Sequence, residues 1–252
     1  MAYWNDPRPR QWGLGGPAGP LSIVAAPGRV GTYDAGLRRY MLSIYNYMAS
    51  GVLLSGIVAL LFTRSGYAAQ AMTGGPLSWL IILSPLAFVV AMSFGANRMH
   101  TATVQALFWG FCIVMGLSLS ALLLVFTGAS IAAAFFAAAG AFAGLSLVGY
   151  TTKKDLSGMG TFLIMGVIGL IVAMLVNMFM QSTSLHLAIS FLGVLIFAGL
   201  TAYDTQRLKA RYGELWHSAF MGKSVVLGAL TLYLDLINIF QFLLSFMGQQ
   251  RD

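Results

Sequence analysis

Two aspartates, Asp204 and Asp235, lie inside long apolar stretches near the C-terminal end of the chain. The sequence holds seven acidic residues, and the other five lie in the tails or between apolar stretches: Asp6, Asp34, Asp155, Glu214 and Asp252. A carboxylate that faces hydrocarbon costs on the order of 2.5–3.5 kcal/mol, so it survives where it faces a bundle interior, water or a partner. We therefore predict that Asp204 and Asp235 are functional residues.

Two neighbouring carboxyl groups in a membrane can act as a pH-sensitive gate. They cannot both ionise without strong repulsion, so they titrate as a unit and can share one proton in a hydrogen-bonded latch. Loss of that proton drives the groups apart and leaves a site for a hard cation such as Ca²⁺, which prefers oxygen ligands. We predict that Asp204 and Asp235 form such a pH sensor and ion gate and bind Ca²⁺ transiently, provided that they meet.

Smaller polar residues share a helix face with each aspartate. At 100° per residue, the polar residues of the last apolar stretch fall within about 120° of arc. The predicted pore-lining residues on the two stretches are His186, Ser190, Thr201, Thr231, Asn238 and Gln241. The alternative is that these side chains only hydrogen-bond between helices and hold the bundle together.

Composition identifies an all-α integral membrane protein. The chain is 58% hydrophobic and 8% charged, with a mean hydropathy of +0.81, whereas soluble domains carry about 25% charged residues. Crossing the bilayer takes about 20 apolar residues. Seven stretches qualify: about 42–62, 77–96, 103–126, 129–150, 160–180, 186–205 and 223–247. Residues 1–40 hold five of the seven prolines and are predicted to be a disordered, basic cytoplasmic tail.

Charge orients the predicted bundle. Of 14 Lys and Arg residues, only Arg64 and Arg251 fall on one side. The other twelve fall on the opposite side: Arg8, Arg10, Arg29, Arg38, Arg39, Arg98, Lys153, Lys154, Arg207, Lys209, Arg211 and Lys223. By the positive-inside rule the N-terminus is cytoplasmic and, after seven full spans, the C-terminus is outside. A re-entrant last segment would instead return Arg251 to the cytoplasm. Within the fourth stretch, the Gly140–Gly144 spacing predicts close helix contact.

Four segments resemble the transmembrane Bax inhibitor motif (Bax inhibitor-1) family, bacterial branch. They are TKKDLS at 152–157, NMFMQSTSLHLAIS at 177–190, TAYDTQRLK at 201–209 and LYLDLINIFQFLL at 232–244. The resemblance implies a membrane domain at 41–250 in which the last of seven helices is surrounded by the other six. It also implies a pH-sensitive Ca²⁺ leak across the bacterial inner membrane.

The resemblance also assigns roles to particular residues. Asp204 and Asp235 match the family's hydrogen-bonded pH sensor, and Arg98 stands where a basic residue can engage Asp204 as a latch. The alternative for Arg98 is a positive-inside anchor. Some members carry a glutamate where this chain has Ala87.

Two other functions compete with a channel. Tyr203-Asp204 resembles the YD motif of intramembrane aspartyl proteases, but the second aspartate lacks the Gly-x-Gly-Asp turn of that class. The other alternative is a membrane regulator that acts through protein partners without transport. We predict no enzymatic activity, no cofactor and no nucleic-acid partner, and expect the lipid bilayer and cations in transit as partners.

Overall fold

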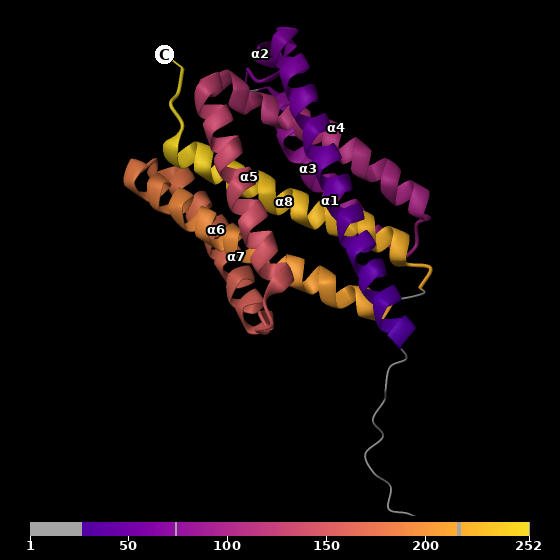
Figure 1. The fold of residues 1–252 in the computed structure, drawn as a ribbon. Helices are drawn as coiled ribbons and strands as arrows, with labels where there is room; N and C mark the ends of the chain where they lie inside the picture. Colours follow the sequence, from indigo (N-terminus) through magenta and orange to yellow (C-terminus); the bar gives the residue numbers. More distant parts are fainter. Residues whose placement is uncertain (1–26, 74, 216–217, 252) are drawn as a thin grey trace, which may run out of the picture.

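The computed structural model describes residues 27–73, 75–215 and 218–251 (Figure 1). They form α1 (Pro27–Arg64), α2 (Tyr67–Ala71), α3 (Pro76–Gly95), α4 (Thr101–Val125), α5 (Gly128–Thr151), α6 (Ser157–Met180), α7 (Thr183–Leu215) and α8 (Met221–Met247). All except α2 are long and apolar enough to cross a membrane. Within these ranges no β-strand forms, so the predicted all-α membrane bundle is confirmed.

Two helices extend well beyond their predicted spans. α1 begins at Pro27, so the predicted tail boundary at residue 40 is wrong for residues 27–40, while residues 1–26 lie outside the described ranges. α7 continues to Leu215 instead of ending near residue 205. The extensions stabilise each other, because the ring of Tyr212 lies 5.2 Å from that of Tyr33 and 5.4 Å from that of Tyr40. Runs of apolar residues do not reveal aromatic packing of this kind, so the predicted spans were too short.

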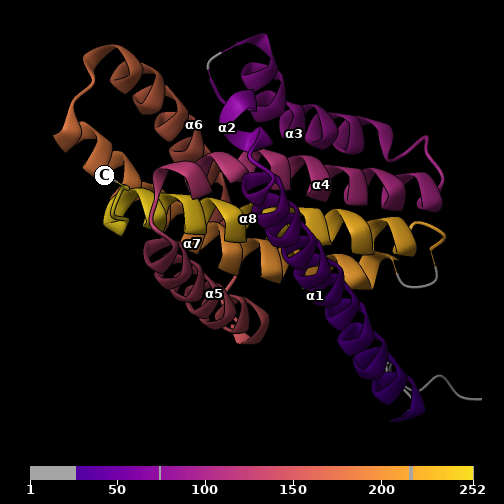
Figure 2. The ribbon, with the colours of Figure 1, turned by 90° about the horizontal axis from the view of Figure 1, so that it is seen from above.

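The last helix, α8, is the most enclosed of the seven spans. In its most apolar window 61% of residues are buried, against 11% for α6. It packs against α1, α4, α5 and α7, while α3 lies on α4 and α6 lies on α7 (Figure 2). The resemblance implied a last helix surrounded by the other six spans; α8 is central here, with α3 and α6 in an outer layer. The central position of α8 explains its abundance of large buried side chains.

Glycines mark several of the closest helix contacts, but Gly140 and Gly144 are not among them. A Cβ atom at Gly149 of α5 would collide with the carbonyl oxygen of Ala202 on α7, and one at Gly160 of α6 would meet the ring of Tyr203. Gly140 and Gly144 are exposed, and a Cβ atom at either would meet nothing within 4 Å. The predicted contact at that glycine pair is therefore wrong. The close contacts surround the segment of α7 that carries Asp204.

Candidate functional site

The two aspartates lie at similar depths on the neighbouring antiparallel helices α7 and α8. Asp204 precedes the end of α7 by about three turns, and Asp235 follows the start of α8 by about four turns. The predicted spans 186–205 and 223–247 would place Asp204 at the end of its span and Asp235 in the middle. The extension of α7 to Leu215 removes that mismatch, because it places Asp204 within the helix.

Both carboxyl groups are buried, and their charges interact. Asp204 is 9% exposed and Asp235 is 4% exposed. Asp204 is the charged neighbour that acts on Asp235. One oxygen of Asp235, Oδ2, is buried and has no hydrogen-bond partner among the residues that the structure describes. The shared-proton bond between the two carboxyl groups stays a prediction.

Positive charge reaches Asp204 from its own helix. The guanidinium groups that act on it belong to Arg207 and Arg211, which follow it at three and seven residues and so share its helix face. Arg98 is exposed in the turn between α3 and α4, and no ion pair with Asp204 forms in the described part of the chain. In the sequence prediction, Arg207 and Arg211 served only to orient the chain in the membrane. Their spacing of three and seven residues from Asp204 already indicated that they share its helix face.

Four of the predicted pore-lining residues hydrogen-bond to their own helix. Ser190, Thr201, Thr231 and Asn238 donate to the backbone carbonyl four residues earlier, at 2.9, 2.9, 3.1 and 2.8 Å. Ser190 and Thr201 are buried, whereas Thr231 and Asn238 are half-buried. Local bonds of this type satisfy the side chain without a neighbouring helix. These four residues therefore do not connect helices in this conformation.

The remaining two candidates lie toward the other end of α7 and α8. His186 is exposed, and its Nε2 atom lies 2.9 Å from Oγ of Ser245, which joins α7 to α8. Gln241 is half-buried on α8. The His186–Ser245 bond is the interhelical type of contact that was the alternative to a pore-lining role.

A set of buried hydroxyl groups near the aspartates was missed by sequence analysis. Ser146 of α5 shares hydrogen bonds with Tyr45 of α1 and, at 3.0 Å, with Thr205 of α7. Tyr40 of α1 bonds to Ser224 of α8 at 2.8 Å. Tyr40 thus bonds to the helix that carries Asp235, and Tyr45 is linked through Ser146 to the helix that carries Asp204. The sequence feature that could have indicated them is the group of four tyrosines at 33, 40, 45 and 47, whose hydroxyl groups need hydrogen-bond partners when buried.

Lys209 and Gln206 fix the end of α5 and the loop that follows it to α7. Nζ of Lys209 donates to the carbonyl oxygen of Tyr150 at 2.7 Å and lies 4.9 Å from the centre of the Tyr150 ring. The amide of Gln206 donates to Lys154 O at 2.8 Å and accepts from Leu156 N at 2.9 Å. These bonds hold the α5–α6 loop beside the part of α7 that follows Asp204.

Comparison with known proteins now decides the family. The model of the family described as Inhibitor of apoptosis-promoting Bax1 matches residues 37–252. The chain belongs to this family. Family membership confirms the resemblance inferred from the four sequence segments.

Bacterial members are similar over nearly their whole length. An uncharacterized protein of Caulobacter vibrioides is 47% identical over 231 residues, which cover 87% of this chain and 92% of that protein. The inner membrane protein YbhL of Escherichia coli (strain K12) is 40% identical over 220 residues, covering 86% of this chain and 94% of YbhL. An uncharacterized protein of Rickettsia prowazekii is 44% identical, over 88% of this chain and 94% of that protein.

Proposed function

We propose that this protein is a pH-sensitive cation leak pathway of the bacterial inner membrane, with Ca²⁺ among its ions and Asp204 and Asp235 as its gate. The name of the relative YbhL supports the choice of membrane. The observation that carries the proposed gate is the buried oxygen of Asp235 that has no hydrogen-bond partner. An ionised carboxylate left in that state is strongly destabilised, so a proton or a cation is needed there.

The charges around the pair give the gate its pH sensitivity. Asp204 and Asp235 compete for protons, because ionising both places two like charges on packed helices. Arg207 and Arg211 follow Asp204 at three and seven residues on the same helix face and bring positive charge toward it, so we propose that the proton resides mainly on Asp235. Removing that proton leaves two carboxylates that repel each other and attract a cation.

Apolar packing closes the path in the described conformation. Beyond Asp235, α8 buries several apolar side chains toward its C-terminal end: Leu236, Ile237, Ile239, Phe240 and Leu244. A hydrated cation cannot cross such a segment without the helices moving, because ions are poorly solvated by hydrocarbon. We infer that repulsion at the aspartate pair shifts α8 relative to α7 and admits water along their shared polar faces. Arg98 would act as the latch in a state in which it reaches Asp204.

The pair suits brief ion contact better than a permanent metal site. Ca²⁺ takes six to eight oxygen ligands, and two carboxylates supply few of these. Over the described ranges, no group of three or more His, Cys, Asp and Glu side chains is placed to hold a metal ion. A passing ion would therefore keep most of its water ligands.

Flux through the purified protein in liposomes tests the function. We expect Ca²⁺ entry that depends on protein and on pH, and we expect Asp235→Asn to remove the pH dependence. Asp34→Asn is the matched control, because Asp34 is exposed near the start of α1. Absence of cation flux at every pH would refute the leak and favour a regulator that acts through protein partners. Cleavage of a membrane-embedded peptide by the same preparation would instead support the protease alternative.

A further inference from the structure

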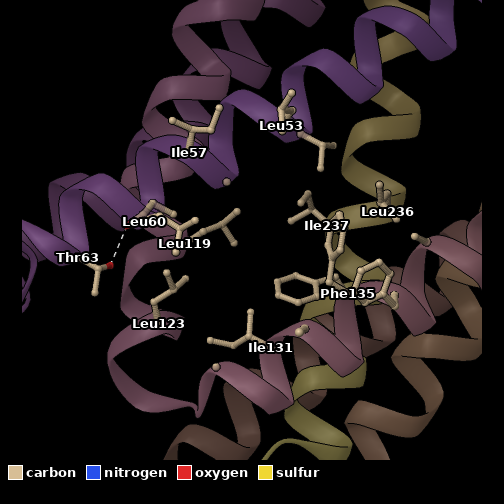
Figure 3. A pocket seen from close by; sticks show the side chains of 18 of the residues that line it. Leu53, Ile57, Leu60, Thr63, Leu119, Leu123, Ile131, Phe135, Leu236 and Ile237 are labelled. Carbon is tan, nitrogen blue, oxygen red and sulfur yellow. Dashed lines mark hydrogen bonds between the residues drawn. The ribbon is translucent and has the colours of Figure 1, made fainter.

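A large apolar groove lies between α1 and α5, and neither aspartate lines it. Its main cavity has a volume of about 930 Å³ and is lined by residues of α1, α4, α5 and α8. Figure 3 shows Leu53, Ile57 and Leu60 facing Ile131, Phe135 and Ile237 across the hollow. The volume falls at the upper end of the roughly 300–1,000 Å³ typical of small-molecule sites.

The groove opens on the surface that faces the bilayer. Its rim residues Leu53, Leu60 and Phe136 are 65%, 50% and 73% exposed. A second cavity of about 630 Å³ continues along the same two helices, and Met48 and Phe142 line both cavities. The two cavities together form an elongated path along the bundle, in which Arg38, Tyr45, Ser146 and Tyr150 also line the second cavity. The apolar main cavity suits a hydrocarbon chain better than a compact solute.

Two arginines line the main cavity, Arg64 at the end of α1 and Arg251 after the end of α8. These are the two cations that the charge distribution leaves on the side opposite to the other twelve. Both side chains are exposed. A guanidinium group binds phosphate oxygens through charge-assisted hydrogen bonds, and two of them beside an apolar cavity are complementary to an anionic headgroup.

Backbone hydrogen bonds hold the C-terminal segment in a position from which Arg251 lines the groove. Arg251 N donates to Val125 O at 2.8 Å, and Thr127 N donates to Gln249 O at 3.0 Å. Gln249 N also donates to Oγ of Ser130 at 3.0 Å. This short pairing with the α4–α5 turn fixes the backbone of Arg251 close to the first residues of α5.

From these observations we propose that the groove between α1 and α5 binds one phospholipid. Its phosphate lies between Arg64 and Arg251, and an acyl chain enters the apolar cavity and packs against α8. The bound lipid therefore contacts the central helix at Leu236 and Ile237, directly after Asp235. This site is separate from the aspartate pair, and the proposal does not depend on ion conduction.

Native mass spectrometry of the full-length protein in detergent tests the site. The probes are dioleoyl phosphatidylglycerol and dioleoyl glycerol, which share their chains but differ in the phosphate headgroup. We expect the phospholipid to bind about tenfold more tightly, the factor lost when a charge-assisted hydrogen bond of about 1.5 kcal/mol is removed. Arg64→Gln with Arg251→Gln should erase this preference. Lys153→Gln with Lys154→Gln removes the same charge from an exposed loop and should leave it unchanged.

A second pair of variants tests occupancy of the cavity. Gly56 lines the main cavity, and a Cβ atom there meets nothing within 4 Å, so Gly56→Leu should fill the space without a clash. Gly140→Leu is the control, because Gly140 is equally open but does not line the cavity. We expect only Gly56→Leu to weaken binding of the phospholipid, again by about tenfold.

Three results would overturn the proposal. The first is equal binding by the Gly56→Leu and Gly140→Leu variants, and the second is equal binding of the two lipids by the parent protein. The third is a parent dimer that Gly56→Leu dissociates while phospholipid binding is unchanged, which would make the groove an interface between two copies. Thermal unfolding of each variant shows whether it is still folded, so that weaker lipid binding is not mistaken for loss of the fold.

Discussion

The hydroxyl group of Tyr233 on α8 donates a hydrogen bond to Oγ of Ser55 on α1, with the oxygens 2.7 Å apart. Ser55 in turn donates to the carbonyl oxygen of Cys112 on α4 at 2.6 Å. All three residues are buried, and the Tyr233 ring packs edge-on against Phe111 at 5.1 Å. One serine thus joins three helices at the centre of the bundle, and its partner Tyr233 lies two residues before Asp235.

Removing the Tyr233 hydroxyl should destabilise the bundle. We expect Tyr233→Phe to lower the free energy of unfolding by about 1 kcal/mol, because a buried hydrogen bond is lost while the ring remains. Tyr67→Phe removes a hydroxyl from a side chain that is 66% exposed and serves as the control. Chemical unfolding in detergent, followed by circular dichroism, compares the two. Equal stability of both variants would show that the bond adds nothing.

A methyl group at Gly149 should force α5 and α7 apart. Because its Cβ atom would collide with the carbonyl oxygen of Ala202, we expect Gly149→Ala to cost about 1–3 kcal/mol, the usual range for overpacking. Gly144→Ala, on an open face of the same helix, should be neutral or slightly stabilising. Thermal unfolding of the two variants provides the comparison, and a neutral Gly149→Ala variant would contradict the close contact.

The two aspartate variants should not act independently. If Asp204 and Asp235 share one titration, the effects of Asp204→Asn and Asp235→Asn on the pH profile of Ca²⁺ flux are non-additive. Each amide can hydrogen-bond but cannot ionise, so either change should flatten the profile. The two variants can differ in direction, since one can hold the pair together while the other leaves a lone carboxylate. Profiles identical to that of the parent in both single variants would rule out the pair as sensor.

Asp155 should titrate below its ordinary range. Hydrogen bonds from the Ser157 side chain and backbone stabilise its carboxylate and lower its pKa from 3.8. The ionised form therefore stabilises the start of α6 at pH values above 3.8, and this contribution is lost as pH falls through the lowered pKa. Ser157→Ala should raise the pKa of Asp155 toward 3.8. Carboxyl NMR of the labelled protein in micelles measures it, and an unchanged value would show that Ser157 is not the cause.

The orientation of the chain remains a prediction with a direct test. The twelve cations on one side place the N-terminus in the cytoplasm and the C-terminus outside. The 27 residues of α8 form one continuous helix of about 40 Å, which is sufficient to cross the bilayer. A reporter fused after residue 252 should thus be active only outside, and one in the loop at 152–156 only inside. Cytoplasmic activity after residue 252 would restore the re-entrant alternative.

The sequence alone determined the class of the protein and most of its spans. Apolar runs of bilayer length are dictated by hydrophobicity, so the predicted span 77–96 differs by one residue at each end from α3, Pro76–Gly95. The two aspartates in such runs, Asp204 and Asp235, also stood out as candidate site residues, because burying a charge in hydrocarbon is costly. The predicted helix ends were wrong where the helices continue into polar sequence, because hydrophobicity gives no information there. The polar ends of α1 and α7 continue as helix because Tyr33, Tyr40 and Tyr212 pack together.

Only the tertiary structure decided which residues are neighbours. A Gly-xxx-Gly spacing at Gly140 and Gly144 is the same in the sequence whether it faces lipid or a helix, whereas the isolated Gly149 makes the close contact. Likewise, helical phase placed Thr201 and Asn238 on polar faces, and the structure adds that each bonds to its own backbone; their pore-lining role stays a prediction. Helical periodicity shows which residues share one face of a helix but not which other helix that face contacts. The rotation and tilt of each helix depend on packing against distant segments. The depth match between Asp204 and Asp235 and the groove bounded by Arg64 and Arg251 arise from that packing.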